Sequence, residues 1–294
     1  MSFKYINPGY PRLGGADFDH QTGNINPVNN IYCYSDIVGS IDFPSDCNEI
    51  WAKADFYNRN NSWYGEIGVG NPVSSGTGRN STYPFYGFFR NEYRPCYCIG
   101  GDAIILSQIP SLETGRQYSV LVHCKNGENG FLLIYLNGLL IYSYSGIVTW
   151  PAHKITWRNA KGNISVHNII VSDEEISLSE QVYVVPAKTT ETTMTESNGT
   201  YTASEVGQTL KQTVDTDALV AKVGSSDIKI TGVGFHSSAL FDGEGLTKLG
   251  FLNGDIEVSE ESLRTTNYEY ASSWCADMSL AELATIKVGC IAKE

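Results

Sequence analysis

The chain has 294 residues, enough for two domains of ordinary size, and its 32 Asp and Glu against 20 Lys and Arg give a net charge of −12. No run of basic residues interrupts this acidity, so the sequence predicts neither a nucleic-acid partner nor attraction to an anionic membrane. We also expect no secretory signal and no membrane insertion, because no apolar stretch approaches the ~20 residues of a membrane helix. The location stays unknown, with a virion or release from the cell as the routes that fit.

The seven cysteines cannot all pair with one another, and none has the Cys-x-x-Cys spacing of a zinc or redox site. Cys96 and Cys98 would share one face of a strand, either as half of a metal site or as two small buried residues. We favour the second interpretation. Mostly reduced thiols fit synthesis in a cytosol.

In chain order, residues 49–57 alternate as an early strand, and residues 63–70 are its expected hairpin partner across the polar turn 58–62. Residues 71–82 have the composition of a long loop, and residues 83–95 are dense in aromatic side chains. Long loops inside compact domains are often functional. Eighteen tyrosines in the chain suit sugar recognition, although strands favour tyrosine in any case.

The centre of the chain predicts a three-stranded meander. Residues 118–124 and 131–136 form two strands separated by a polar turn, and a third strand follows Asn137-Gly138. Asn-Gly between apolar and aromatic runs indicates a two-residue hairpin turn, because both residues reach positive φ at little cost. Strands at residues 102–107, 154–158 and 162–171 complete the unit.

The order of these strands resembles the late strands of concanavalin A-like jelly rolls of the laminin-G type, over residues ~10–182. The resemblance implies an all-β fold in which two antiparallel sheets form a jelly-roll sandwich and the last strand returns beside the first. It speaks to fold and carries no active-site signature.

We expect a jelly roll over residues 1–185, a Thr-rich linker over residues 186–201 and a smaller β-rich domain over residues 202–294. The C-terminal part resembles no family. Its predicted elements are strands at residues 227–231, 246–251, 255–258 and 286–291, with a hairpin at Asn253-Gly254 and a helix that begins with a capping box of Ser279 and Glu282.

No catalytic motif stands out. Jelly-roll glucanases carry Glu-x-Asp-x-x-Glu on one strand, which is absent, and Glu49 and Asp55 are separated by ~20 Å of extended strand. Residues 51–58 are similar to a motif of jelly-roll alginate lyases, but they stand in an early strand and the accompanying motifs are missing, so we treat the match as chance. His123 and His167 fall inside strands, where histidines are more often satisfied sheet residues than bases.

We expect no cofactor, although calcium accompanies related folds and loop carboxylates could bind it; the candidates are Asp36, Asp42, Asp46 and Asp102.

The sequence therefore predicts a non-catalytic binding or adhesion protein that recognises a glycan or a surface protein, such as a phage tail or receptor-binding virion component. The C-terminal part would either attach the chain or make it a homo-oligomer. The alternatives are a structural assembly module and a divergent polysaccharide-active enzyme. The predicted ligand-binding residues, which combine rings for stacking with a forked donor, are Trp63, Tyr86, Arg90 and Tyr93.

Overall fold

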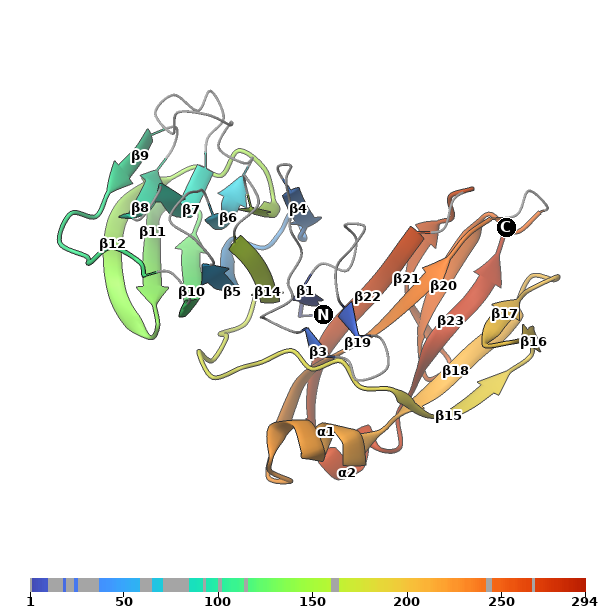
Figure 1. Cartoon of the computed structure of the whole chain (residues 1–294). Coiled ribbons are helices and arrows are strands. Elements are labelled where there is room, and N and C mark those ends of the chain that lie inside the picture. The colour runs from blue at the N-terminus through green and yellow to red at the C-terminus, as the bar shows by residue number, and fades with distance from the viewer. Residues whose placement is uncertain are drawn as a thin grey trace. The chain divides into compact units, whose positions relative to one another are not determined.

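A computed structural model describes residues 2–9, 18–19, 24–25, 37–58, 65–70, 85–91, 94–99, 102–113, 116–159, 164–241, 245–265 and 268–294 (Figure 1). Contacts divide the chain into a first unit that ends at Val182 and a second unit from Tyr183 to Glu294. Strands dominate both units, which confirms the predicted all-β class.

Two six-stranded antiparallel sheets make up the first unit. Sheet I has the order β1-β14-β5-β10-β11-β12 and sheet II the order β4-β13-β6-β7-β8-β9. The strands of sheet I are β1 (Lys4–Gly9), β5 (Glu49–Asn58), β10 (Arg116–Lys125), β11 (Gly127–Leu136), β12 (Leu139–Val148) and β14 (Ile164–Ser172). Those of sheet II are β4 (Ile37–Asp42), β6 (Gly65–Gly70), β7 (Phe85–Asn91), β8 (Arg94–Ile99), β9 (Asp102–Ile105) and β13 (Lys154–Asn159), and a short pair, β2 (Phe18–Asp19) and β3 (Asn24–Ile25), lies outside both sheets.

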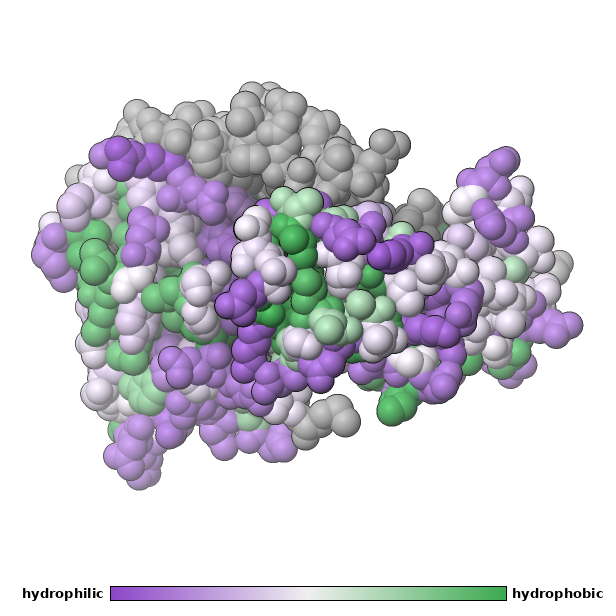
Figure 2. All heavy atoms as spheres, turned by 90° about the horizontal axis from the view of Figure 1, so that it is seen from below, coloured by the Kyte–Doolittle hydropathy of each residue, from purple (hydrophilic) through white to green (hydrophobic). Residues whose placement is uncertain are grey.

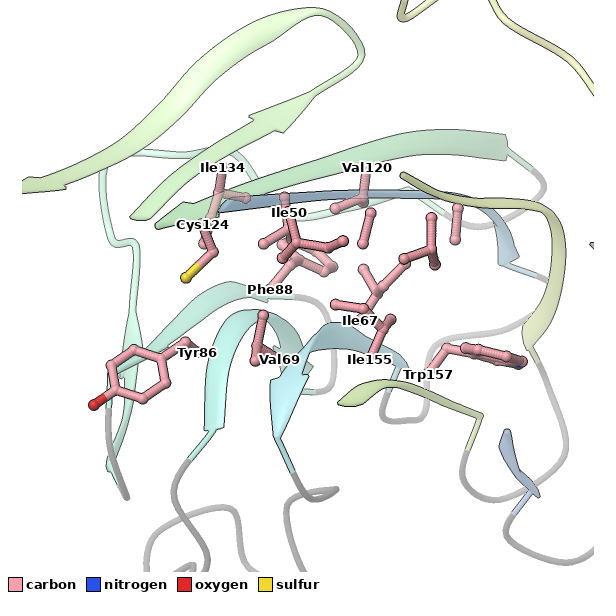
Figure 3. Close-up of a cluster of buried hydrophobic side chains, with 14 of the residues drawn as sticks. Ile50, Ile67, Val69, Tyr86, Phe88, Val120, Cys124, Ile134, Ile155 and Trp157 are labelled. Carbon is pink, nitrogen blue, oxygen red and sulfur yellow. The ribbon is translucent and has the colours of Figure 1, made fainter. Parts of the chain in front are cut away.

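The core lies between the two sheets, because one side chain in two along each inner strand turns inward. Figure 3 shows side chains from opposite sheets pointing toward one another, among them Ile50, Val120, Ile134, Ile67, Val69 and Phe88. Burying one such side chain contributes roughly 1.5–3 kcal/mol. The side chains between them lie on the other face of each sheet.

The predicted hairpin is confirmed. Asn137 and Gly138 have φ of 49° and 84°, and β11 and β12 pair on either side of them. The last strand, β14, also pairs with β1 as the jelly-roll resemblance implied.

The predicted hairpin between residues 49–57 and 63–70 is wrong. β5 pairs with β10 and β14 in sheet I, whereas β6 pairs with β13 and β7 in sheet II. Both strands bury an apolar inner face, so their periodicity fits either partner, and the chain crosses from one sheet to the other between them.

The second unit contains a five-stranded antiparallel sheet III of order β15-β18-β23-β20-β21. Its strands are β15 (Ala187–Thr192), β18 (Thr209–Val214), β20 (Lys248–Asn253), β21 (Ile256–Ser262) and β23 (Lys287–Lys293). Two further pairs are β16 (Thr195–Ser197) with β17 (Thr200–Thr202) and β19 (Lys229–Ala239) with β22 (Tyr268–Ser279), and the helices are α1 (Thr216–Val223) and α2 (Leu280–Leu283).

The hairpin of β20 and β21 and the capping box of Ser279 and Glu282 at α2 are confirmed, whereas α1 was not predicted. Residues 186–201, predicted as a linker, contain β15, β16 and the first two residues of β17, and β15 pairs with β18 of sheet III. The domain limits themselves stay a prediction. No helix in the described part of the chain is long and apolar enough to cross a membrane.

Candidate functional site

The outer face of sheet I concentrates polar and aromatic side chains. Alternation along β5 turns Ile50, Ala52 and Ala54 into the core, so the residues between them face outward. β10 lies beside β5 in register and follows the same pattern, which sets His123 opposite Trp51 and Ser119 opposite Asp55. The face divides into two halves that differ in exposure.

The open half consists of Glu49, Trp51, His123, Lys125 and Phe131. The His123 ring stacks on Trp51, with ring centroids 4.0 Å apart and an interplanar angle of 17°, and meets Phe131 edge-on at 4.7 Å. These two contacts fix the plane of the imidazole. The His123 side chain is 16% exposed, so part of it lies at the surface.

A carboxylate orients the same imidazole. His123 Nε2 lies 2.9 Å from Glu49 Oε1, and Lys125 Nζ lies 3.1 Å from the other oxygen of Glu49. Burial raises the pKa of Glu49, but the hydrogen bonds from His123 and Lys125 outweigh it and the pKa is lowered. An ionised Glu49 can only accept a hydrogen bond, so the proton of neutral His123 is on Nε2 and the lone pair is on Nδ1.

The surroundings of His123 favour its neutral form. Burial lowers its pKa below the ordinary 6.5, although the hydrogen bond and the charge of Glu49 act in the opposite direction. A neutral, oriented imidazole whose second nitrogen carries a lone pair is the arrangement of a general base.

The covered half lies beneath residues 173–182, which we call the covering segment. Ile176 and Leu178 of this segment pack with Leu121 and Ile170 of the sheet. Lys53 is fully buried below it and donates to the carbonyl oxygens of Leu178, at 2.9 Å, and Glu180. Burial lowers the pKa of Lys53, while the charges of Asp55 and Glu180 oppose this shift. Lys4 forms an ion pair with the Glu180 side chain of the same segment.

A polar row crosses the covered half at Ser119, Asp55 and His167, which are register partners on β10, β5 and β14. Gln117 and Asn168 donate to Asp55 Oδ2 at 3.2 and 2.7 Å. Ser119 Oγ, Asp55 Oδ1 and His167 Nδ1 are buried and have no hydrogen-bond partner among the described residues. Burial lowers the pKa of His167, and the charge of Asp55 raises it.

The structure separates the four predicted ligand-binding residues. Tyr86 is only 7% exposed, belongs to the core, and its hydroxyl accepts a hydrogen bond from the backbone of Thr149. It therefore offers no exposed ring. Arg90 lies on β7, but its side chain is outside the described residues, as are Trp63 and Tyr93, so a ligand-binding role for these three stays a prediction.

Of the four calcium candidates, Asp42 pairs with Lys154 at 3.5 Å and Asp46 is exposed, while Asp36 and the Asp102 side chain lie outside the described residues. Within the described ranges, no three His, Cys, Asp or Glu residues gather as metal ligands would.

Sequence reasoning did not select the open half. The sequence analysis named Glu49 and His123 and predicted the alternation along β5. It considered each histidine by itself and interpreted it as an ordinary sheet residue. The signal that was present is the joint alternation of Glu49 and Trp51 on one strand with His123 and Lys125 on another, which becomes informative only once the two strands are paired in register.

No protein-family model matches the chain, and no curated protein matches it either. Among solved structures, it is similar to a mutant of the alginate lyase Aly36B in complex with alginate trisaccharide, at 16% identity and a TM-score of 0.33, over 46% of this chain and 73% of that one. An endo-β-1,4-glucuronan lyase from the fungus Trichoderma reesei matches at 10% identity and a TM-score of 0.32, over 49% and 80%. The galectin LEC-6 of Caenorhabditis elegans matches at 11% identity and a TM-score of 0.31, over 48% and 99%.

These neighbours are sheet-rich sandwich proteins, as a jelly roll requires, and do not confirm the laminin-G type. They correct the prediction of a non-catalytic binding or adhesion protein, because polysaccharide lyases stand first among them and fit the alternative of a polysaccharide-active enzyme better. Their names mention no phage, virion or adhesion role, no surface-protein partner and no oligomer. At these identities and scores, the likeness carries no argument about residues or reaction.

Proposed function

We propose that the first unit is a polysaccharide-active enzyme whose catalytic base is His123 in the open half. The observation that carries the proposal is the hydrogen bond of 2.9 Å between His123 Nε2 and an ionised Glu49, which fixes the tautomer with a free lone pair on Nδ1. Trp51 and Phe131 position the ring, and Lys125 supplies a positive charge beside it.

The residues favour elimination over hydrolysis. Glycoside hydrolysis requires one carboxylic acid that gives up a proton and a second carboxylate nearby. Glu49 is unsuited to the acid role, because its hydrogen bonds to His123 and Lys125 lower its pKa. A single neutral base next to a cation instead suits removal of a proton from the carbon beside a carboxylate.

The substrate class that follows is a polysaccharide containing uronic acid. Lys125, which is 44% exposed and already pairs with Glu49, would also donate a hydrogen bond to the uronate carboxylate, and Nδ1 of His123 would take the proton on the adjacent carbon. The electron pair of the broken C–H bond forms the new double bond, the bond to the glycosidic oxygen breaks, and that oxygen takes a proton from water. The laminin-G type of the sandwich is part of the proposal too, supported by the pairing of β14 beside β1.

The test is to incubate the full chain with uronate polysaccharides, such as alginate and polyglucuronate, and with neutral glucans. Unsaturated products are followed by ultraviolet absorbance, and new reducing ends are followed separately. We expect products from a uronate polymer and a loss of roughly 100-fold or more in His123→Gln. His153→Gln, at a half-buried histidine that packs against Phe43 and Trp150, is the matched control and should retain activity.

Two results would contradict the proposal. Reducing ends without unsaturated products would indicate hydrolysis, and equal activity in His123→Gln and the wild type would remove His123 from the reaction. Absence of activity on every polymer would reject an enzymatic role for this face.

A further inference from the structure

The outer edge of sheet I is an unprotected strand. β12 is the last strand in the sheet order, and within the described ranges no strand pairs with its free side. Its ten residues, Leu-Leu-Ile-Tyr-Ser-Tyr-Ser-Gly-Ile-Val, include no charge and no proline. Proteins normally protect a long edge with charged residues, proline or a covering element, since an open edge pairs with another strand.

The exposure of apolar side chains on β12 supports this view. Leu139, Leu140 and Ile147 are 71%, 52% and 67% exposed. Figure 2 shows hydrophobic atoms gathered on the side of the first unit where β11 and β12 lie in Figure 1. The edge strand of sheet III makes a useful contrast: β21 also exposes an isoleucine, Ile256, but it carries three glutamates over seven residues. Charge therefore protects that edge and not this one.

We infer that β12 pairs antiparallel with β12 of a second copy of this chain across a two-fold axis beside Tyr144. In a two-fold pair each strand lies against an identical strand that runs in the opposite direction. The side chains at one end of β12 must therefore fit those at its other end, and they do. With the axis at Tyr144, Ser143 of one copy lies opposite Ser145 of the other. Both serines face outward, because their register partners on β11 are the outward-facing Leu133 and Phe131.

A bulge in β12 completes the match. The ladder with β11 passes from Tyr142 to Leu140 and leaves Ile141 without a register partner. This extra residue sets Leu140 of one copy opposite Ile147 of the other. Leu140 faces outward with its partner Tyr135. Ile147 has no register partner on β11, but it is 67% exposed and precedes the buried Val148, so it faces outward as well. These two exposed apolar side chains would therefore cover each other at both ends of the pair.

The experiment measures the mass of the full chain by light scattering and sedimentation at micromolar concentration. We expect a dimer for the wild type and a monomer for Ile147→Lys, because the edge lysine leaves a charge against the second copy's Leu140. Ile256→Lys makes the same change at an equally exposed isoleucine on β21 and should stay dimeric. A monomeric wild type, or a dimer that survives both Ile147→Lys and Leu140→Lys, overturns the inference.

Cross-linking tests the register even if a lysine variant fails to fold. Ser143→Cys mixed with Ser145→Cys should give a disulfide-linked dimer on mild oxidation, since these positions face each other across the axis. Each variant alone should cross-link no more than the wild type. Equal cross-linking in the mixture and in the separate variants would contradict this pairing.

Discussion

The two halves of the outer face of sheet I are built from the same strands but have opposite environments. Lys53 and Lys125 both point away from the core, yet Lys53 is fully buried and Lys125 is 44% exposed. The alternation of β5 and β10 creates both halves alike. The covering segment decides which polar groups reach solvent, so burial here is determined by the chain that crosses the sheet and not by the strand pattern.

This difference also separates two kinds of histidine. Burial lowers the pKa of both His123 and His167, but His123 has an ionised partner and an exposed edge, whereas His167 Nδ1 has no partner among the described residues. The open half therefore suits proton transfer with an external molecule. The polar groups of the covered half are buried, so their removal should lower the stability of the fold.

The largest effect expected from this contrast is on stability. Lys53→Met should lower the free energy of unfolding by about 3 kcal/mol or more, because it leaves Asp55 buried without its neighbouring cation and two carbonyls of the covering segment without a donor. Lys125→Met, on the same face, should cost less than about 1 kcal/mol. Denaturant titration of both variants measures the difference, and equal losses would erase the distinction between the halves.

The covering segment itself is the next target. Ile176→Ala should cost about 2–4 kcal/mol, since the side chain is 2% exposed and fills the contact with Leu121 and Ile170. Amide exchange should also become faster in residues 173–182 and in β5. Ile104→Ala, at an isoleucine of β9 that is 47% exposed, is the control and should change stability by no more than about 0.5 kcal/mol. If exchange stays slow while stability falls, the segment does not open on its own.

The acid response tests the buried His167. Burial depresses the folded-state pKa of His167 below the unfolded value of 6.5, so the unfolded state binds a proton first. The contribution of His167 to the free energy of unfolding is therefore fully present above pH 6.5. It is lost as the pH falls from 6.5 toward the folded-state pKa. His167→Gln should make this decline shallower, as shown by thermal unfolding at a series of pH values. An unchanged decline would mean that other groups cause it.

The sequence indicated many of the strands but missed α1, the strands of residues 186–201 and the site. Asn137-Gly138 dictated its hairpin locally, because positive φ at both positions leaves few alternatives. The partner of β5 could not be read in the same way, since β6 and β10 both present an apolar face to the same core. The covered half depends on residues 173–182 lying over strands more than a hundred residues earlier in the chain, as the bond from Lys53 to Leu178 shows. No local pattern encodes that contact.

The smallest expected effect is the most specific for the proposed base. The acid limb of kcat/KM on a uronate polymer should lie below pH 6.5, because burial lowers the pKa of His123 and the base must be neutral to act. Glu49 raises that pKa through its hydrogen bond and charge, so Glu49→Gln should move the acid limb to still lower pH while reducing the rate. Glu128→Gln, at an exposed position on β11, should leave the limb in place. A purely structural role for Glu49 would lower activity at every pH without moving the limb, and that outcome would detach Glu49 from the protonation of His123.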